Sequence, residues 1–169
     1  ALMRGGYAAE AAARFAQLLA EQPGDPALRF NCAWATALTG DHAAARAMLD
    51  DDLTSALPQA AQLEVQLLHQ AGEFDLAAER ARGHLARHPD YPPLLAAVSV
   101  LALDVDDDEL ALSCAQGGGA HPDALTTLGT LTLGDMELDR AQALFEQALA
   151  QNAQSPRAWI GLGLAHMAR

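Results

Sequence analysis

Proline recurs along the chain at nearly equal intervals, and this period constrains the fold more than any other feature of the sequence. Five prolines are separated by 32, 34, 30 and 34 residues: Pro26, Pro58, Pro92, Pro122 and Pro156. The remaining three lie beside them: Pro23, Pro89 and Pro93. A proline inside a helix costs about 3 kcal/mol, so the stretches between the prolines are free to form helices. The sequence therefore predicts a repeat of about 33 residues.

A series of alanines supports the same period. They are separated by 34, 32, 34 and 30 residues: Ala11, Ala45, Ala77, Ala111 and Ala141. Four positions after each alanine, one helical turn on, stands an apolar residue: Phe15, Leu49, Ala81, Ala115 or Phe145. Between the two series, Gly40, Gly72 and Gly134 each precede an acidic residue. Because glycine ends helices and acids favour helix starts, each unit is predicted to be two helices joined by a turn.

Composition favours an all-helical chain and excludes several classes of function. The 169 residues suit one domain, and the 39 alanines favour helices. Lysine is absent, and the 10 arginines against 22 acids give a net charge of −12. A nucleic-acid partner is therefore not expected. The lack of lysine excludes a Walker A loop, a Schiff-base lysine and lysine-assisted serine catalysis within this chain.

The two cysteines and the apolar runs bear on the compartment. Cys32 and Cys114 fall about two repeats apart, so we predict free thiols, which favours the cytoplasm, with the periplasm as an alternative. The longest apolar run, residues 94–103, is about half of what a membrane span needs. We expect no membrane insertion. Because the chain begins with alanine, we expect a fragment of a longer protein.

Several short motifs recur with this period. One opening motif consists of Trp159, Leu162 and Gly163, and a second of Leu125, Leu128 and Gly129. The pattern from Ala141 to Phe145, followed by Ala148 and Leu149, matches the second helix of the same repeat. Over essentially its whole length, the chain closely resembles a tetratricopeptide repeat protein of bacterial type. The resemblance implies a right-handed superhelical solenoid of antiparallel helix–turn–helix repeats.

The repeats can be placed along a single domain, residues 1–169. Residues 1–25 form a partial repeat, with a helix remnant at 1–4 and a second helix from Tyr7 to Gln22. Full repeats cover 26–57, 58–91, 92–121 and 122–155, and a terminal capping helix covers 156–169. In the fourth unit, Asp106 stands at the turn, and we expect the run from Gly117 to Gly119 to cut the second helix short and begin a long loop.

Candidate metal and catalytic motifs are weak, and we predict no metal, no cofactor and no enzyme activity. His84 and His88 have zinc-ligand spacing but no third ligand, and are interpreted as surface histidines near a helix end. Asp104, Asp106 and Asp108 lack the glycine and glutamate of a calcium loop, so the acids there are read as a helix start. The run from Asp50 to Asp52 is interpreted as a solvated turn. No nucleophile elbow or phosphate loop occurs.

The resemblance implies that the first helix of each repeat lines a concave groove. The predicted partner-binding residues are Phe30, Trp34, Gln62, Gln66, His69, Ala96, Val100, Leu103, Thr126 and Thr130. An alternative is that Phe30 and Trp34 only pack between repeats. Since none of these positions is basic, we reject the clamp by which some family members hold carboxylates. A neutral or apolar peptide is expected, with the glutamines bonding its backbone.

We therefore expect a non-enzymatic protein-interaction module or scaffold. Two alternatives stay open: the targeting arm of a longer enzyme such as a glycosyltransferase or sulfotransferase, and a chaperone or assembly factor for secretion or pili. Apolar surface at the first and last helices also predicts weak self-association.

Overall fold

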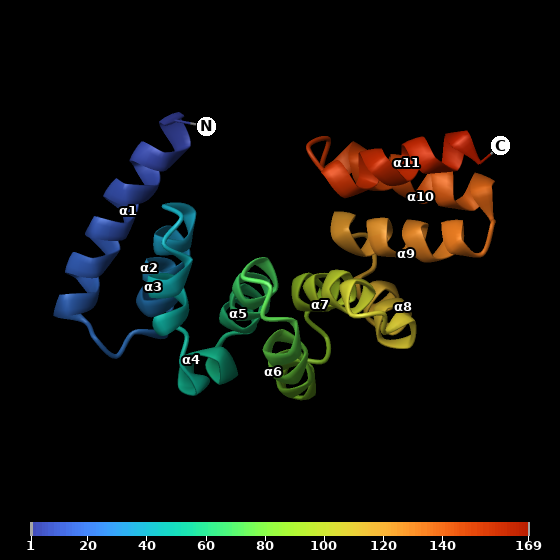
Figure 1. Cartoon of the computed structure of the whole chain (residues 1–169). Helices are drawn as coiled ribbons and strands as arrows, with labels where there is room; N and C mark the ends of the chain where they lie inside the picture. Colours follow the sequence, from blue (N-terminus) through green and yellow to red (C-terminus); the bar gives the residue numbers. More distant parts are fainter. Residues whose placement is uncertain (1, 169) are drawn as a thin grey trace. The chain divides into compact units, whose positions relative to one another are not determined.

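The computed structural model describes residues 2–168, with side chains from Gly6 onward. Within that range the chain is helical and contains no strand (Figure 1). The all-α fold predicted from the sequence is therefore confirmed. The helices are α1 (Leu2–Glu21), α2 (Pro26–Leu38), α3 (His42–Ala47), α4 (Asp51–Ala56), α5 (Pro58–Gln70), α6 (Phe74–Arg87), α7 (Pro92–Asp104), α8 (Asp108–Gly118), α9 (Pro122–Gly134), α10 (Leu138–Gln151) and α11 (Pro156–Met167).

Each of the five periodic prolines begins a helix. Helices α2, α5, α7, α9 and α11 all carry proline in their first turn, where the missing N–H has no partner to lose. A side chain just before the proline caps three of these helices; in α9 the Nδ1 of His121 accepts from the backbone N–H of Asp123 at 3.3 Å. Asp25 accepts from the backbone N–H of Ala27 at 2.8 Å, and Ser155 accepts from that of Ala158 at 3.4 Å.

The turn after each of the first four of these helices contains one residue with positive φ, always 14 positions after the proline. These residues are Gly40 (93°), Gly72 (74°), Asp106 (57°) and Met136 (63°). The sequence-based assignment of Gly134 as a turn residue was wrong, because Gly134 is the last residue of α9. A residue other than glycine pays steric strain in this left-handed region, so the last two turns are held by packing of the helices on either side.

The described residues form two compact units, divided between Glu73 and Phe74. In the first unit α1 packs on α2, which in turn contacts α3 and α4. Instead of a remnant and a second helix from Tyr7, α1 is one helix that begins at Leu2. The second helix of the 26–57 unit is divided into α3 and α4. Asp50 caps α4, and Asp51 and Asp52 form its first turn, which corrects the solvated turn expected there.

Phe145 of α10 centres the core of the second unit, where α9, α10 and α11 lie side by side (Figure 1). The ring is fully buried, and it fills space that two glycines leave free. A Cβ on Gly129 would lie 2.7 Å from the Phe145 ring, and one on Gly161 would lie 2.3 Å from it. The two glycines therefore let α9 and α11 approach α10 closely.

Glycine also determines how α8 meets its neighbours. The glycine run does cut the helix short, because α8 has 11 residues against 14 in α6 and α10 and ends at Gly118. The expectation of a long loop was wrong, because only three residues separate α8 from α9. Gly118 is buried, and a Cβ there would lie 2.8 Å from the Cβ of Ala124. Glycine at position 118 therefore allows α8 and α9 to pack closely. The assignment of the repeats to one domain stays a prediction.

Candidate partner-binding site

A pocket of about 300 Å³ in the second unit is formed by α7, α9 and α11. We call it the α11 pocket; its lining residues are Leu103, Asp104, Thr130, Leu133, Arg157, Ile160, Gly161 and Leu164. Most of the side chains from α9 and α11 stand 4, 8 or 11 positions after the helix's own proline, which places them on one helical face. Two predicted residues, Leu103 and Thr130, are thus brought together here.

The wall from α11 is apolar and open to solvent. Ile160 is 62% exposed and Leu164 is 50% exposed. Neither was predicted as a binding residue. The offsets used for the earlier helices, carried forward from Pro156, would have found both. Exposed large apolar side chains that converge on a pocket are typical of binding surfaces.

Polar groups in the α11 pocket are largely satisfied by the chain itself. Arg157, a basic residue that the sequence analysis did not place in the groove, donates to the Asp104 carboxylate at 2.5 Å. Thr130 is exposed, but its hydroxyl donates to the Thr126 carbonyl at 3.0 Å. The pocket therefore presents mainly carbon surface, beside one internally paired charge.

The other residues predicted in the second unit are less accessible. Thr126 is 4% exposed, and its hydroxyl donates to the Pro122 carbonyl at 2.8 Å. Val100 is half-buried, and Ala96 is fully buried in a small cluster with Ala115 and Ala124. On α7, Leu103 and Val100 are therefore partly accessible to a partner, while Ala96 and Thr126 are buried in the protein interior.

The first unit has a comparable pocket of about 360 Å³ between α2 and α5, lined in part by Trp34, Leu38, Leu63 and Gln66. We call it the Trp34 pocket. Trp34 is 49% exposed, whereas Phe30 packs against the core cluster of the unit. The two aromatic residues therefore have different surroundings.

Of the predicted glutamine-rich set, Gln66 lines this pocket, and Gln62 and His69 are half-buried on α5. Glu64 lies on the same helix, at a position where the resembled family usually has leucine, and its side chain is buried.

His84 and both cysteines are buried in the structure. His84, expected on the surface, is only 1% exposed. Among the described residues no three His, Cys, Asp or Glu side chains are grouped as metal ligands. Both cysteines are buried and free. Burial, with a smaller contribution from Asp107, raises the pKa of the Cys114 thiol to about 11, so this thiol is protonated at neutral pH and unreactive.

No helix in residues 2–168 is both long and apolar enough to cross a membrane. No curated protein sequence matches the chain. Residues 126–169 match the sequence model of the tetratricopeptide repeat.

Solved structures share the fold at low sequence identity. TTC0263, a thermophilic tetratricopeptide repeat protein of Thermus thermophilus, is 18% identical, with 96% of this chain and 92% of that chain covered and a TM-score of 0.71. The Cut9–Hcn1 hetero-tetramer of the APC/C is 18% identical, with 96% and 34% covered and a TM-score of 0.83. YrrB, described as having an unusual peptide-binding site, is 17% identical, with 90% and 82% covered and a TM-score of 0.66.

These findings agree with the period of the prolines and with the arrangement of the helices. Stacked helical repeats of this kind present extended binding surfaces. Residues 126–169 match the tetratricopeptide repeat in sequence, and the described residues share the fold of solved tetratricopeptide repeat structures.

Proposed function

We propose that the chain is a non-enzymatic interaction module that binds a neutral, apolar segment of a partner protein in the α11 pocket. The exposure of Ile160 and Leu164 beside this pocket supports the proposal most directly. Each of these side chains is at least half exposed, so a partner could cover apolar area that the fold itself leaves in water. Burial of such area contributes roughly 25 cal/mol per Å².

The polar inventory of the α11 pocket supports a neutral partner. Arg157 is paired with Asp104, and the Thr130 hydroxyl already bonds within its own helix. An acidic segment would have to displace this ion pair against a chain charge of −12. Specificity would then come from the shape of apolar side chains, and salt would change the affinity little.

The Trp34 pocket is proposed as a second contact of the same kind. Trp34 supplies a half-exposed aromatic face, and aromatic residues are frequent hot spots. Gln62, Gln66 and His69 lie on the adjacent α5, where their side chains could bond the backbone of an extended peptide.

Selection from a phage-displayed library of random short peptides on the immobilised chain tests the proposal. We expect the enriched peptides to be apolar and without net negative charge, and a Leu164→Gln variant to bind them at least about tenfold more weakly. Leu76→Gln is the matched control, because Leu76 is 38% exposed on α6 and lines neither pocket. Equal loss in both variants, or enrichment of acidic peptides, would show that the proposal is wrong.

Replacement of Trp34 by alanine separates binding from folding in the first unit. Because Trp34 is half exposed, we expect the melting temperature to change by no more than about 2 °C, while peptide affinity falls by about 2 kcal/mol. Phe30→Ala should instead lower the melting temperature, since Phe30 packs on the core cluster. Titration calorimetry and thermal melts of both variants check this, and a sharply lower melting temperature for Trp34→Ala would place Trp34 in the core.

The alternative roles, a targeting arm of a longer enzyme or an assembly factor for secretion or pili, would use the same surface and stay open beside this proposal. Cytoplasmic location also stays a prediction. Weak self-association is proposed on the exposure of Tyr7 (73%) and Met167 (84%), and light scattering over a concentration series tests it.

A further inference from the structure

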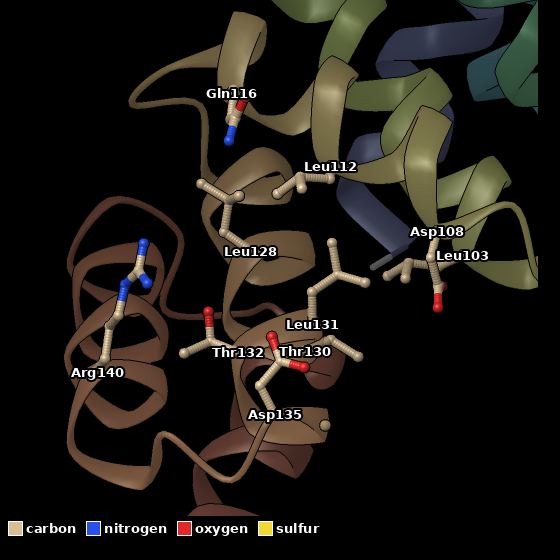
Figure 2. A pocket seen from close by; sticks show the side chains of 11 residues that line it. Leu103, Asp108, Leu112, Gln116, Leu128, Thr130, Leu131, Thr132, Asp135 and Arg140 are labelled. Atoms are coloured by element: carbon tan, nitrogen blue, oxygen red, sulfur yellow. The ribbon is translucent and has the colours of Figure 1, made fainter.

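A cavity of about 760 Å³ in the second unit has a floor of leucines (Figure 2). We call it the leucine cavity; its floor consists of Leu103, Leu112, Leu128 and Leu131, contributed by α7, α8 and α9. Figure 2 shows the side chains of Leu112 and Leu128 pointing toward one another. Leu112 is 43% exposed, so the floor is accessible from solvent. The cavity shares Leu103 and Thr130 with the α11 pocket.

Negative charge dominates the lining of the leucine cavity. Asp108 in the first turn of α8 and Asp135 at the C-terminal cap of α9 both line it. Within the described part of the chain, neither carboxylate has an ion-pair partner. The basic residue of the lining, Arg140, is paired with Glu137 at 3.1 Å. The charge of Arg140 is thus offset, and two carboxylates are left in the lining beside the leucines.

Helix ends add to this negative charge. Asp135 stands at the carboxyl end of α9, and Leu103 is the penultimate residue of α7, so both helices end beside the cavity. Neither helix has a basic residue in its last turn. The carboxyl end of a helix carries partial negative charge, which favours a cation by about 0.3–1 kcal/mol. The amino end of α8, which begins at Asp108, lies at the same cavity and carries partial positive charge, so it offsets part of this effect. The two carboxylates are therefore the main reason that the cavity favours a cation.

We infer that the leucine cavity binds a lysine or arginine side chain of a partner segment, together with an adjoining apolar side chain. The inference rests on the proposed function, since it adds a cationic residue beside the apolar segment held in the α11 pocket. Lysine and arginine combine an aliphatic stem with a charged head, so the stem would lie on the leucines and the head would reach Asp108 or Asp135. The volume lies within the range of about 300–1,000 Å³ that is usual for ligand sites.

Two synthetic fluorescein-labelled peptides with the same leucines test the inference by fluorescence anisotropy. One carries a single lysine between its leucines, and the other carries glutamine there. We expect the lysine peptide to bind about fivefold more tightly. Asp108→Asn and Asp135→Asn should each weaken its binding about threefold and leave the glutamine peptide unchanged. Leu112→Gln should weaken both peptides, because both use the leucine floor.

Matched variants separate this site from a diffuse attraction to an acidic surface. Asp90→Asn removes the same charge from an exposed position of the same unit that does not line the cavity, and should leave the affinity unchanged. An equal loss with Asp90→Asn overturns the inference. If Leu164→Gln abolishes binding while Asp135→Asn has no effect, the peptide uses only the α11 pocket; the inference then fails and the proposed function stands. Failure of the lysine peptide to bind, while apolar peptides selected from the random library do bind, has the same meaning.

Discussion

Two glycines of α11 that stand two positions apart have opposite roles. A Cβ on Gly161 would lie 2.3 Å from the Phe145 ring, whereas one on Gly163 would have nothing within 4 Å. We expect Gly161→Ala to lower the free energy of unfolding by about 1–3 kcal/mol through overpacking. Gly163→Ala should raise it by about 0.5–1 kcal/mol, because alanine favours the helix. Urea unfolding followed by circular dichroism measures both, and a similar effect of the two changes would contradict the packing described for Phe145.

The sequence allowed some of these residue roles to be predicted and left others undecided. The period placed Phe145 one helical turn after Ala141 on a packed helix face, because core positions recur with the repeat. Exposure within one helical face follows from the neighbouring helices, which a single sequence does not specify. Phe30 and Trp34 share a face of α2, yet one packs on the core and the other is half exposed. The sequence also does not show that the Thr126 hydroxyl donates to the Pro122 carbonyl of its own helix.

At the scale of the elements, the turn between α9 and α10 has its left-handed residue at Met136 and not at Gly134. Met136 has a φ of 63°, whereas Gly134 ends α9 with no left-handed backbone. We expect Met136→Gly to stabilise the chain by about 1 kcal/mol, since glycine adopts this conformation without strain. Gly134→Ala should be neutral or stabilising. Thermal melts of both variants check this, with Gly40→Ala, at a φ of 93°, as the control that must destabilise. If Gly134→Ala destabilises the chain, Gly134 and not Met136 is the residue with left-handed backbone in this turn.

The division between α3 and α4 depends on a single capping carboxylate. Asp50 accepts from the backbone N–H of Leu53 at 2.9 Å and from the Arg29 side chain, and these hydrogen bonds hold the pKa of Asp50 below its usual value. A lowered pKa stabilises the native state above the unfolded pKa, and this contribution is lost as the pH falls through the folded value. Asp50→Ala should therefore cost about 1 kcal/mol at neutral pH and progressively less below about pH 4.

Urea unfolding of Asp50→Ala and the parent chain across this range measures the cap, and Asp52→Ala, which removes a carboxylate that caps nothing, serves as its control. A difference that stays constant with pH would show that ionised Asp50 does not stabilise α4.

Helix starts were predictable from the sequence because proline acts through local backbone geometry. The short connection after α8 was not predictable, since three consecutive glycines suggest a long loop by residue type alone. Gly118 is the last residue of α8, and Ala124 lies so close to it that only glycine fits there. The turn residue Met136 was also missed, although its distance of 14 positions from Pro122 equals that of Gly40 from Pro26. Counting from the proline would have been a better guide than the type of residue.

At the scale of the whole molecule, charge opposes the folded state at neutral pH. Even if each of the 10 arginines paired with one of the 22 acids, 12 carboxylates would remain unpaired. Repulsion among them destabilises a compact chain, and salt screens it over a Debye length that falls from about 14 Å at 0.05 M to about 4 Å at 0.5 M. We expect the melting temperature at pH 7 to rise by about 2–4 °C over this range, which corresponds to roughly 1 kcal/mol.

The same protein near its isoelectric point is the control for this effect. At a pH near 4.6 the net charge is close to zero, so screening no longer relieves a net repulsion and weakens only attractive pairs such as Arg157–Asp104 and Arg140–Glu137. Salt should then leave the melting temperature unchanged or lower it slightly. Melts at low protein concentration limit association near the isoelectric point. A melting temperature that falls with salt at pH 7 would mean that the ion pairs outweigh the repulsion, and that the acidic excess contributes to partner choice without a cost in stability.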